Sequence, residues 1–263
     1  MGLQARLEGF CFSFMNTSAN NKNIVLAKKL LQKKYRDLEK KYLVEGAKLV
    51  REVFSCNQSV DFLVVSENDF DKYTDILDGK KFFTVDERTF STLTDTVTDQ
   101  GILAVVNKPS LPLRSPESNA LVLDRLQDPS NVGAILRTAA AAGYNDVYMV
   151  ECADPYSPKC IRAGMSSQFR LNIFSASAEE ILAEIKGNCP LICADMEGEN
   201  VFDCGRFGRH ALVLGNEGGG VGEIFRSVCD KTVSLPMSNC VESLNVAVSA
   251  GILMYLLTNS QTK

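Results

Sequence analysis

The sequence LGNEGGGVG at residues 214–222 follows directly from the apolar run 211–214, which is typical of a buried β-strand. Five of the eight residues from 215 to 222 are glycine, which indicates a turn where backbone comes close to other backbone or to a ligand. The turn lacks the Gly-Lys-Ser/Thr of a P-loop and the glycine spacing of a dinucleotide-binding motif. It therefore favours neither of these nucleotide enzymes.

Other apolar runs are separated by segments with helical periodicity. The predicted strands are residues 121–123, 147–150, 171–174, 191–194, 211–214 and 232–235. This alternation predicts an α/β fold with a mainly parallel sheet and helices on both faces. Such sheets bind ligands beyond the carboxyl ends of their strands, so the glycine-rich turn marks a predicted binding site.

Two further blocks place polar residues just beyond predicted strands. One is LDRLQDPSNVGAILRTA at residues 123–139, and the other joins LPM at 235–237 to ESLNVAV at 242–248. Because the carboxyl ends of parallel strands meet at one edge of a sheet, we expect both blocks to lie beside the glycine-rich turn.

Composition limits the class of protein. The chain has 263 residues, 45% of them hydrophobic, and a net charge of -4, which predicts globular domains and not a uniformly basic nucleic-acid coat. Nine cysteines without a C-x-x-C pair, and the single His210, favour reduced thiols and predict no metal site. We expect His210 at the surface or at a strand edge.

The apolar stretch 244–257 is too short to span a membrane, and residues 1–17 lack a signal-peptide pattern.

Three prolines among polar residues identify 109–118 as a linker between two domains, 18–108 and 119–263. In the first domain, residues 24–36 have the pattern of one amphipathic helix, and residues 42–46 lead into another. Residues 62–65 and 102–106 have the pattern of strands. The sequence therefore predicts a smaller N-terminal α/β domain.

Positive charge is concentrated in this first domain. Residues 21–51 contain ten Lys or Arg against three Asp or Glu. The pattern is typical both of a solvated helix face and of a surface that neutralises RNA phosphates. The candidate RNA-binding residues are Lys28, Lys29, Lys33, Lys34 and Arg36.

In order, spacing and residue type, the three blocks resemble the motifs of the SpoU/TrmH family of RNA ribose 2′-O-methyltransferases, within the SPOUT superfamily. The resemblance spans about residues 119–260. The Lys-rich start with YLVEG at 42–46 is similar to the ribosomal-protein-like substrate domain often joined to that catalytic domain. The resemblance implies a trefoil-knot domain that binds S-adenosylmethionine, and a homodimer.

The family motifs carry over to eleven positions of this chain. Contacts with S-adenosylmethionine are implied for Leu214, Gly215, Asn216, Leu235, Met237 and Leu244. The implied reaction centre contains Asn131, Arg137, Glu217, Ser243 and Asn245. A guanidinium seldom gives up its proton, so we expect Arg137 to stabilise negative charge and not to act as a base. Glu217 and Ser243 are also compatible with capping the helices that follow them.

The predicted activity is methylation of a ribose 2′-hydroxyl, with large-subunit ribosomal RNA favoured because of the accessory domain. Transfer RNA is the alternative substrate. A catalytically inactive RNA-binding or ribosome-assembly protein and a base-directed methyltransferase are the alternative functions. We expect a cytoplasmic protein without membrane contact, although an organelle stays open. The modified nucleotide also stays open, as does whether Arg137 acts within its own subunit or across the dimer.

Overall fold

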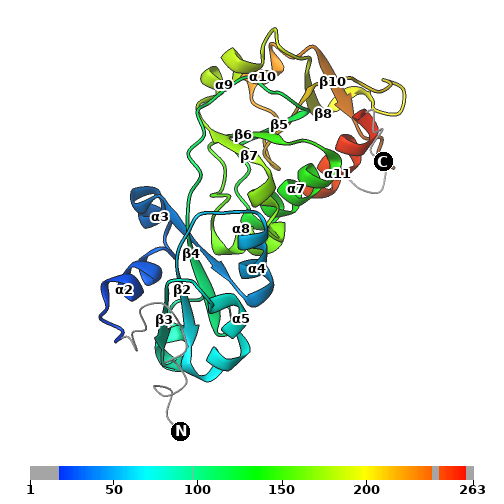
Figure 1. Ribbon diagram of the computed structural model, residues 1–263. Helices are drawn as coiled ribbons and strands as arrows, with labels where there is room; N and C mark the ends of the chain where they lie inside the picture. Colours follow the sequence, from blue (N-terminus) through cyan, green and yellow to red (C-terminus); the bar gives the residue numbers. More distant parts are fainter. Residues whose placement is uncertain (1–17, 97, 239–242, 259–263) are drawn as a thin grey trace. The chain divides into compact units, whose positions relative to one another are not determined.

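The structure is a computed structural model that describes residues 18–96, 98–238 and 243–258. It divides into two compact units (Figure 1). The first unit ends at Pro109 and includes Tyr156–Pro158, and the second contains Ser110–Pro155 and the residues from Lys159 onward. The prediction for residues 1–17 lies outside the described residues. Within the described ranges, no helix is both long enough and apolar enough to cross a membrane.

The first unit contains a four-stranded sheet in the order β1-β4-β2-β3. Its strands are β1 (Lys41–Glu45), β2 (Val60–Ser66), β3 (Phe82–Val85) and β4 (Ile102–Asn107). Its helices are α2 (Lys22–Lys29), α3 (Lys33–Glu39), α4 (Ala47–Ser55), the 3₁₀ helix η1 (Glu67–Lys72), α5 (Thr74–Leu77) and α6 (Glu87–Ser91). The two strands predicted here are present, and Phe62 and Val105 from them pack with Ile24 of α2 in one core.

The prediction of one helix over residues 24–36 is wrong, because the segment forms α2 and α3. Gln32, between them, has extended backbone with φ -100° and ψ 134°. The guanidinium of Arg36 donates hydrogen bonds of 2.8 Å to the carbonyl oxygens of both Leu30 and Leu31. These carbonyls lie at the end of α2, where no helical donor is available, so Arg36 stabilises the bend between the helices.

The second unit is built on a six-stranded sheet in the order β10-β8-β9-β5-β6-β7. All neighbouring strands in it are parallel, which confirms the predicted α/β class. Its strands are β5 (Ala120–Asp124), β6 (Asp146–Val150), β7 (Asn172–Ser175), β8 (Leu191–Asn200), β9 (Ala211–Leu214) and β10 (Lys231–Ser234). Its helices are α7 (Pro129–Ala142), α8 (Pro158–Gly164), the 3₁₀ helix η2 (Ser167–Arg170), α9 (Ala178–Ile185), α10 (Glu223–Arg226) and α11 (Val246–Leu257).

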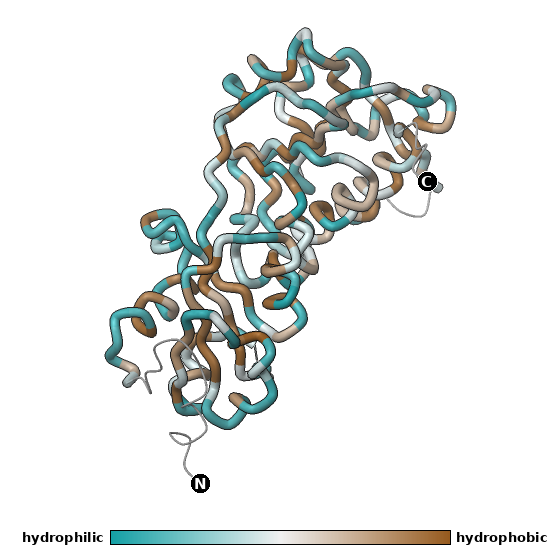
Figure 2. The backbone as a smooth tube through the Cα atoms, viewed as in Figure 1, coloured by the Kyte–Doolittle hydropathy of each residue, from teal (hydrophilic) through white to brown (hydrophobic). Residues whose placement is uncertain are grey.

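Helices cover both faces of this sheet, with α7 and α11 on one face and α9 and α10 on the other (Figure 1). Alternate residues of β5 face opposite sides: Leu121 and Leu123 pack with the first pair of helices, and Ala120 and Val122 with the second. Burial on both faces requires continuous apolar strands, which Figure 2 shows as brown tracts along the sheet. Continuous burial therefore explains why these strands could be predicted from apolar runs in the sequence.

Strand β8 is longer than the predicted run because of an irregularity in its pairing with β10. Cys193 pairs with Thr232, but the next pair along is Glu199 with Val233. The residues in between on β8 therefore leave the regular ladder, as in a large β-bulge. Glycine is required at position 198, where the irregular stretch ends, since a Cβ there would lie 2.6 Å from the Val233 backbone. The bulge carries Asp195 and Met196 to the carboxyl edge of the sheet.

Of the two places expected for His210, the surface and a strand edge, the surface is wrong, because its side chain is fully buried directly before β9. Its Nδ1 lies 2.8 Å from the Gly208 carbonyl oxygen, and its Nε2 lies 2.6 Å from the Tyr144 hydroxyl. A carbonyl only accepts, so Nδ1 carries the proton and Nε2 accepts from Tyr144. Burial lowers the pKa of His210 below its ordinary value of 6.5. The imidazole is therefore neutral in the folded protein near neutral pH.

A neutral buried histidine makes stability depend on pH. Because the pKa of His210 is lower in the folded state, the neutral ring contributes stability above 6.5 that is lost as the pH falls through its folded pKa. We expect the free energy of unfolding, measured by urea denaturation, to fall between about pH 7.5 and about pH 5.5. His210→Gln should be less stable at the higher pH and show a flatter dependence. An equal pH dependence of the free energy of unfolding in the wild type and in His210→Gln would contradict the assignment of a neutral, buried His210.

Candidate functional site

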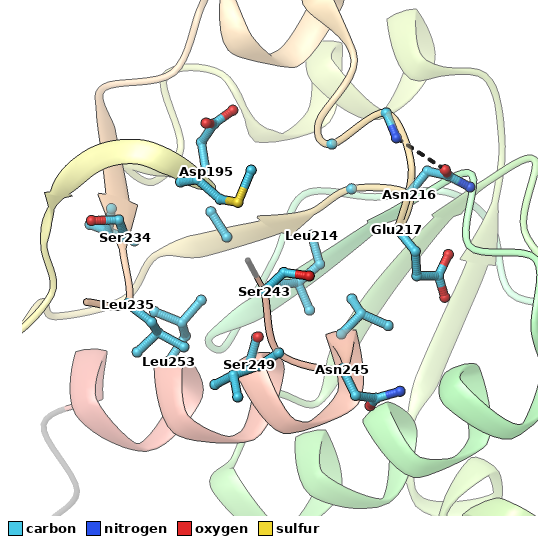
Figure 3. Close-up of a pocket in the computed structure, with 18 of the residues that line it drawn as sticks. Asp195, Leu214, Asn216, Glu217, Ser234, Leu235, Ser243, Asn245, Ser249 and Leu253 are labelled. Atoms are coloured by element: carbon cyan, nitrogen blue, oxygen red, sulfur yellow. Dashed lines mark hydrogen bonds between the residues drawn. The ribbon is translucent and has the colours of Figure 1, made fainter. Parts of the chain in front are cut away.

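A cavity of about 720 Å³ lies beyond the carboxyl ends of β9 and β10 (Figure 3). It brings together the residues predicted to bind S-adenosylmethionine, which all line it: Leu214, Gly215, Asn216, Leu235, Met237 and Leu244. Three residues of the predicted reaction centre also line it: Glu217, Ser243 and Asn245. The cavity thus joins the end of β9 to described residues that follow β10 and precede α11, as expected for parallel strands.

The glycine-rich turn folds back on itself at Gly215. A Cβ at this position would lie 2.1 Å from the carbonyl carbon of Gly220, so only glycine fits. Asn216 and Gly220 exchange two backbone hydrogen bonds, of 2.8 and 3.1 Å. The Asn216 side chain accepts from the amide of Gly218 at 2.9 Å and donates to the Arg125 carbonyl at 2.9 Å. Asn216 therefore fixes the shape of one wall of the cavity.

Asp124, at the end of β5, holds the far end of the same turn. Its carboxylate, only 3% exposed, accepts from the Gly222 amide at 2.7 Å. It also accepts from Nε and Nη2 of Arg125, at 3.0 and 3.1 Å. Arg125 has a φ of 60°, which is unfavourable for a residue with a side chain. Charge-assisted hydrogen bonds to Asp124 offset this strain and tie the first block to the glycine-rich turn.

Three side chains of the predicted reaction centre form a hydrogen-bonded chain. Asn131, in the first turn of α7, donates through Nδ2 to Oε1 of Glu217 at 2.8 Å. Asn245 donates through its own Nδ2 to Oδ1 of Asn131 at 3.0 Å. One residue from each of the three sequence blocks therefore meets at this point, on the side of the cavity where Figure 3 shows Glu217 and Asn245.

The structure also settles the capping alternatives. Asn245 is the N-cap of α11, and its Oδ1 accepts from the amides of Ala247 and Val248 at 2.9 and 3.4 Å. Ser243 lies before the cap, exposed at the cavity, so its capping alternative is wrong. The N-cap of α10 is Gly222, so Glu217 does not cap that helix. The Glu217 side chain instead accepts from Asn131.

Arg137 stands apart from this chain of side chains. It is exposed on α7, six residues after Asn131, which is a different side of the helix. Within the described residues it makes no hydrogen bond or ion pair, with Glu217, Asn245 or any other side chain. One subunit alone therefore does not bring Arg137 into contact with the other predicted reaction-centre residues.

Several lining residues were missed from the sequence. The bulge of β8 contributes Asp195 and Met196, and Arg226 of α10 is paired with Asp195 at 2.7 Å. The remaining additions are Ala194, Gly218, Gly219, Gly220, Val233, Ser234, Val246, Ser249 and Leu253. The one available signal was that Asp195 follows the predicted strand 191–194. Its pairing with Arg226 depends on the bulge, which no local pattern indicates.

The lining chemistry fits S-adenosylmethionine. Leu214, Leu235 and Leu253 give an apolar surface for an aromatic base. The carboxylate of Glu217 favours a ligand that carries positive charge, as the sulfonium and ammonium groups of that molecule do, whereas the charge of Asp195 is offset by Arg226. Among the residues that the structure describes, no group of His, Cys, Asp and Glu has the arrangement of a metal site.

The first unit carries the predicted RNA-binding residues. Lys28, Lys29, Lys33 and Lys34 are exposed on α2 and α3. Arg36 is 4% exposed, and its guanidinium binds backbone carbonyls within the same unit. Its burial corrects the expectation that Arg36 faces RNA, because a guanidinium used in this way is not presented to a phosphate.

The chain belongs to the SpoU rRNA methylase family, whose model matches residues 118–255. A second family model, the MRM3-like substrate binding domain, matches residues 21–104. The chain is 32% identical over 243 residues to the 23S rRNA (guanosine(2553)-2′-O)-methyltransferase RlmP of Bacillus subtilis, covering 91% of this chain and 97% of that protein.

Solved structures agree with this assignment. The chain is similar to an AdoMet-bound rRNA methyltransferase from Sinorhizobium meliloti, with a TM-score of 0.81 and 25% identity over 93% of this chain and 96% of that one. It is also similar to a putative RNA methyltransferase of the TrmH family from Porphyromonas gingivalis, with a TM-score of 0.81 and 28% identity over 92% and 99% of the two chains. The predicted family and the α/β class with a mainly parallel sheet are confirmed.

Removal of the Asp124 carboxylate should release the glycine-rich turn. Asp124→Ala leaves the partly buried Gly222 amide and the Arg125 guanidinium without their acceptor, which we expect to cost about 2 kcal/mol of stability. Hydrogen exchange measured by mass spectrometry should be faster in the peptide that contains residues 215–222. The control is Asp203→Ala, an exposed aspartate in the same unit whose side chain makes no hydrogen bond or ion pair with the described residues. Similar exchange in the two variants would refute the role of Asp124.

Proposed function

We propose that the protein transfers a methyl group from S-adenosylmethionine to a ribose 2′-hydroxyl of large-subunit ribosomal RNA. The observation that carries this proposal is the chain of Asn131, Glu217 and Asn245 beside a cavity lined by all six predicted donor-binding residues. The name of the Bacillus subtilis relative, a 23S rRNA 2′-O-methyltransferase, supports the RNA class.

Bound S-adenosylmethionine supplies an electrophilic methyl group on a positively charged sulfur. The task of the chain is then to align the ribose 2′-oxygen with that methyl group and to manage the hydroxyl proton. Asn131 occupies one oxygen of Glu217 and so orients this carboxylate, whose other oxygen is the proposed acceptor for the hydroxyl proton. Ser243, exposed at the cavity, is proposed to position the ribose.

Arg137 is proposed to stabilise negative charge on the attacking oxygen or on a neighbouring phosphate. A guanidinium keeps its proton at neutral pH and offers a planar pair of donors, which suits an oxyanion or a phosphate. Because Arg137 does not contact Glu217 or Asn245 in one subunit, we propose that it acts in the site of a second copy.

The proposed homodimer forms through α11, next to α7. Val248, Ile252 and Tyr255 recur at helical spacing on α11 and are 50%, 36% and 53% exposed, although their helix is almost entirely apolar. A second copy that covers this stripe would bring the neighbouring helix α7, which carries Arg137, to the interface. We further propose that the segments around the cavity form the trefoil knot implied by the family resemblance.

The two parts of the chain have separate proposed tasks. Residues 18–108 bind RNA through Lys28, Lys29, Lys33 and Lys34, residues 109–118 form a linker, and residues 119–263 perform methyl transfer. The location of the protein is proposed to follow that of its ribosomes, which is the cytoplasm in a bacterial cell.

The activity is tested with purified protein, labelled S-adenosylmethionine and ribosomal RNA, followed by nuclease digestion and mass spectrometry of the nucleosides. We expect a ribose-methylated nucleoside. Arg137→Lys should lower the single-turnover rate about 100-fold, because a point charge does not replace a fork of donors. Arg206→Lys, an exposed arginine in the same unit with no partner among the described residues, is the matched control.

Other outcomes of this experiment identify the alternatives. A methylated base would assign a base-directed enzyme, and transfer only to transfer RNA would assign the other substrate. RNA binding without donor binding in calorimetry would support an inactive RNA-binding or assembly protein. Near-normal turnover of Arg137→Lys would refute the proposed role of its guanidinium.

The dimer is tested by sedimentation of the full chain. We expect twice the chain mass for the wild-type protein and a shift to the monomer for Tyr255→Asp, since a buried charge opposes association. Phe202→Asp, at an exposed apolar residue outside α11, should leave the dimer intact.

Mixed dimers test the position of Arg137. If it acts across the interface, inactive Arg137→Ala and Asn245→Ala subunits should restore about a quarter of wild-type activity when mixed and reassembled, because half the dimers are mixed and hold one intact site. A mixture without activity would place Arg137 in its own subunit.

A further inference from the structure

The helices α2 and α3, called the α2–α3 tip below, are fixed relative to each other by buried side chains. Arg36 is buried, and its guanidinium donates to the carbonyl oxygens of Leu30 and Leu31, which directly follow α2. Leu30 is fully buried between the two helices and the core of the first unit. The side chains displayed on the tip are therefore preorganised, which lowers the entropic cost of binding a partner.

One aromatic side chain lies among the lysines of this tip. Tyr35 on α3 is half-buried, and Lys29 Nζ and Lys34 Nζ lie 5.4 Å and 5.9 Å from the centre of its ring. Leu38, one turn further along α3, is an apolar residue that is 68% exposed, on a helix that Figure 2 shows as mainly hydrophilic. We call Lys29, Lys34, Tyr35 and Leu38 the Tyr35 platform. It presents part of an aromatic ring, an apolar neighbour and two cations to solvent.

The charge around the platform indicates its partner. Residues 21–51 hold ten Lys or Arg against three Asp or Glu, while the whole chain carries a net charge of -4. Two of these cations, Lys41 and Arg51, are paired with Asp61 and Asp75, and Asp37 is paired with Lys108 at 2.8 Å. Lys29 and Lys34 make no ion pair with the described residues. Positive potential is thus concentrated on the part of the surface that exposes the aromatic ring, which favours a polyanion as the partner.

A ring flanked by ammonium groups matches one feature of RNA. Bases inside an A-form duplex do not expose their faces, whereas unpaired bases stack on aromatic side chains while lysines contact the backbone phosphates. An acidic peptide would satisfy the lysines but would leave the ring and Leu38 without a planar partner. The platform therefore favours a single-stranded or looped RNA segment.

We propose that Tyr35 stacks on an unpaired base of the RNA substrate, with Lys29 and Lys34 on the adjoining phosphates. This proposal rests on the proposed function and adds to it a specific requirement, an unpaired nucleotide away from the methylated ribose. It separates the two tasks of the tip: the ring supplies stacking that depends little on salt, and the lysines supply affinity that salt weakens.

The test measures the dissociation constant of the full chain for a ribosomal RNA transcript that the wild-type protein methylates, across a series of salt concentrations. Tyr35→Ala should weaken binding about tenfold. The salt slope, which is the slope of the logarithm of the binding constant against the logarithm of the salt concentration, should be unchanged because stacking is not ionic. Tyr35→Phe should bind within about twofold of the wild type, because the phenyl ring keeps the stacking face. The Lys29→Ala, Lys34→Ala double variant should make the salt slope shallower by about 1 to 2.

The matched control is Phe54→Ala. Phe54 has a lysine ammonium, that of Lys80, 5.1 Å from its ring centre, but it lies on α4 outside the α2–α3 tip. It should leave RNA affinity unchanged. Equal affinity for Tyr35→Ala and the wild type, or an equal loss in Phe54→Ala, would overturn the platform. A Tyr35→Ala defect that also changes the salt slope would reassign the ring to holding the lysines, and it would also overturn stacking.

Activity distinguishes failure of the platform from failure of the proposed function. If both are right, Tyr35→Ala raises KM for RNA about tenfold and leaves kcat unchanged. If the wild-type protein methylates RNA and Tyr35→Ala is indistinguishable from it, the platform alone is wrong. If the wild-type protein neither binds nor methylates RNA, both proposals are wrong. Tyr35→Phe, which keeps the ring, separates loss of stacking from misfolding of α3.

Discussion

The side-chain amide of Asn131 connects the three sequence blocks on which the site depends. It donates to Glu217, 86 residues later in the chain, and accepts from Asn245, 114 residues later. An amide suits this position because one side of it donates and the other accepts. The same contact joins the start of α7, the glycine-rich turn and the N-terminus of α11, so the position of each element constrains the other two.

This arrangement is possible because the sheet of the second unit is parallel. The chain leaves β5, β9 and β10 at the same edge, where each of the three blocks begins. Asp124 then binds the Gly222 amide, and the tight return at Gly215 brings two backbone segments into contact. The partly buried hydrogen bonds at the buried carboxylate of Asp124 hold the turn, whereas the hydrogen bonds of Asn131 are exposed to solvent and are therefore expected to be weaker.

Much of the fold was predictable from the sequence because strands covered on both faces are continuously apolar. The order β10-β8-β9-β5-β6-β7 was not, since strand order depends on long-range packing that leaves no local pattern. The break in the predicted helix 24–36 was missed because Arg36 reads as a surface cation, whereas it binds the carbonyls of Leu30 and Leu31. His210 was misplaced for a similar reason, since its burial depends on Tyr144, 66 residues away.

In the site as well, residues that belong to a local sequence pattern were predicted, and residues placed by long-range contacts were missed. Residues that follow strand ends, such as Asn216 and Leu235, were found from the motifs, and the cavity brings them together. Asp195 was missed because a bulge in β8, and not a sequence motif, places it at the cavity, and Arg226 of α10 was missed because its place there follows from its ion pair with Asp195. The role of Asn245 as the cap of α11 was also missed, since Ser243 and Asn245 are both good caps and only the path of the backbone selects between them.

The most direct test of this account is a crystal structure of the protein with S-adenosylhomocysteine. The account predicts that the ligand occupies the cavity between residues 214–216 on one side and Leu235, Met237 and Leu244 on the other, with its sulfur facing the chain of Asn131, Glu217 and Asn245. A ligand bound elsewhere, or one whose sulfur faces away from that chain in both copies, would contradict it.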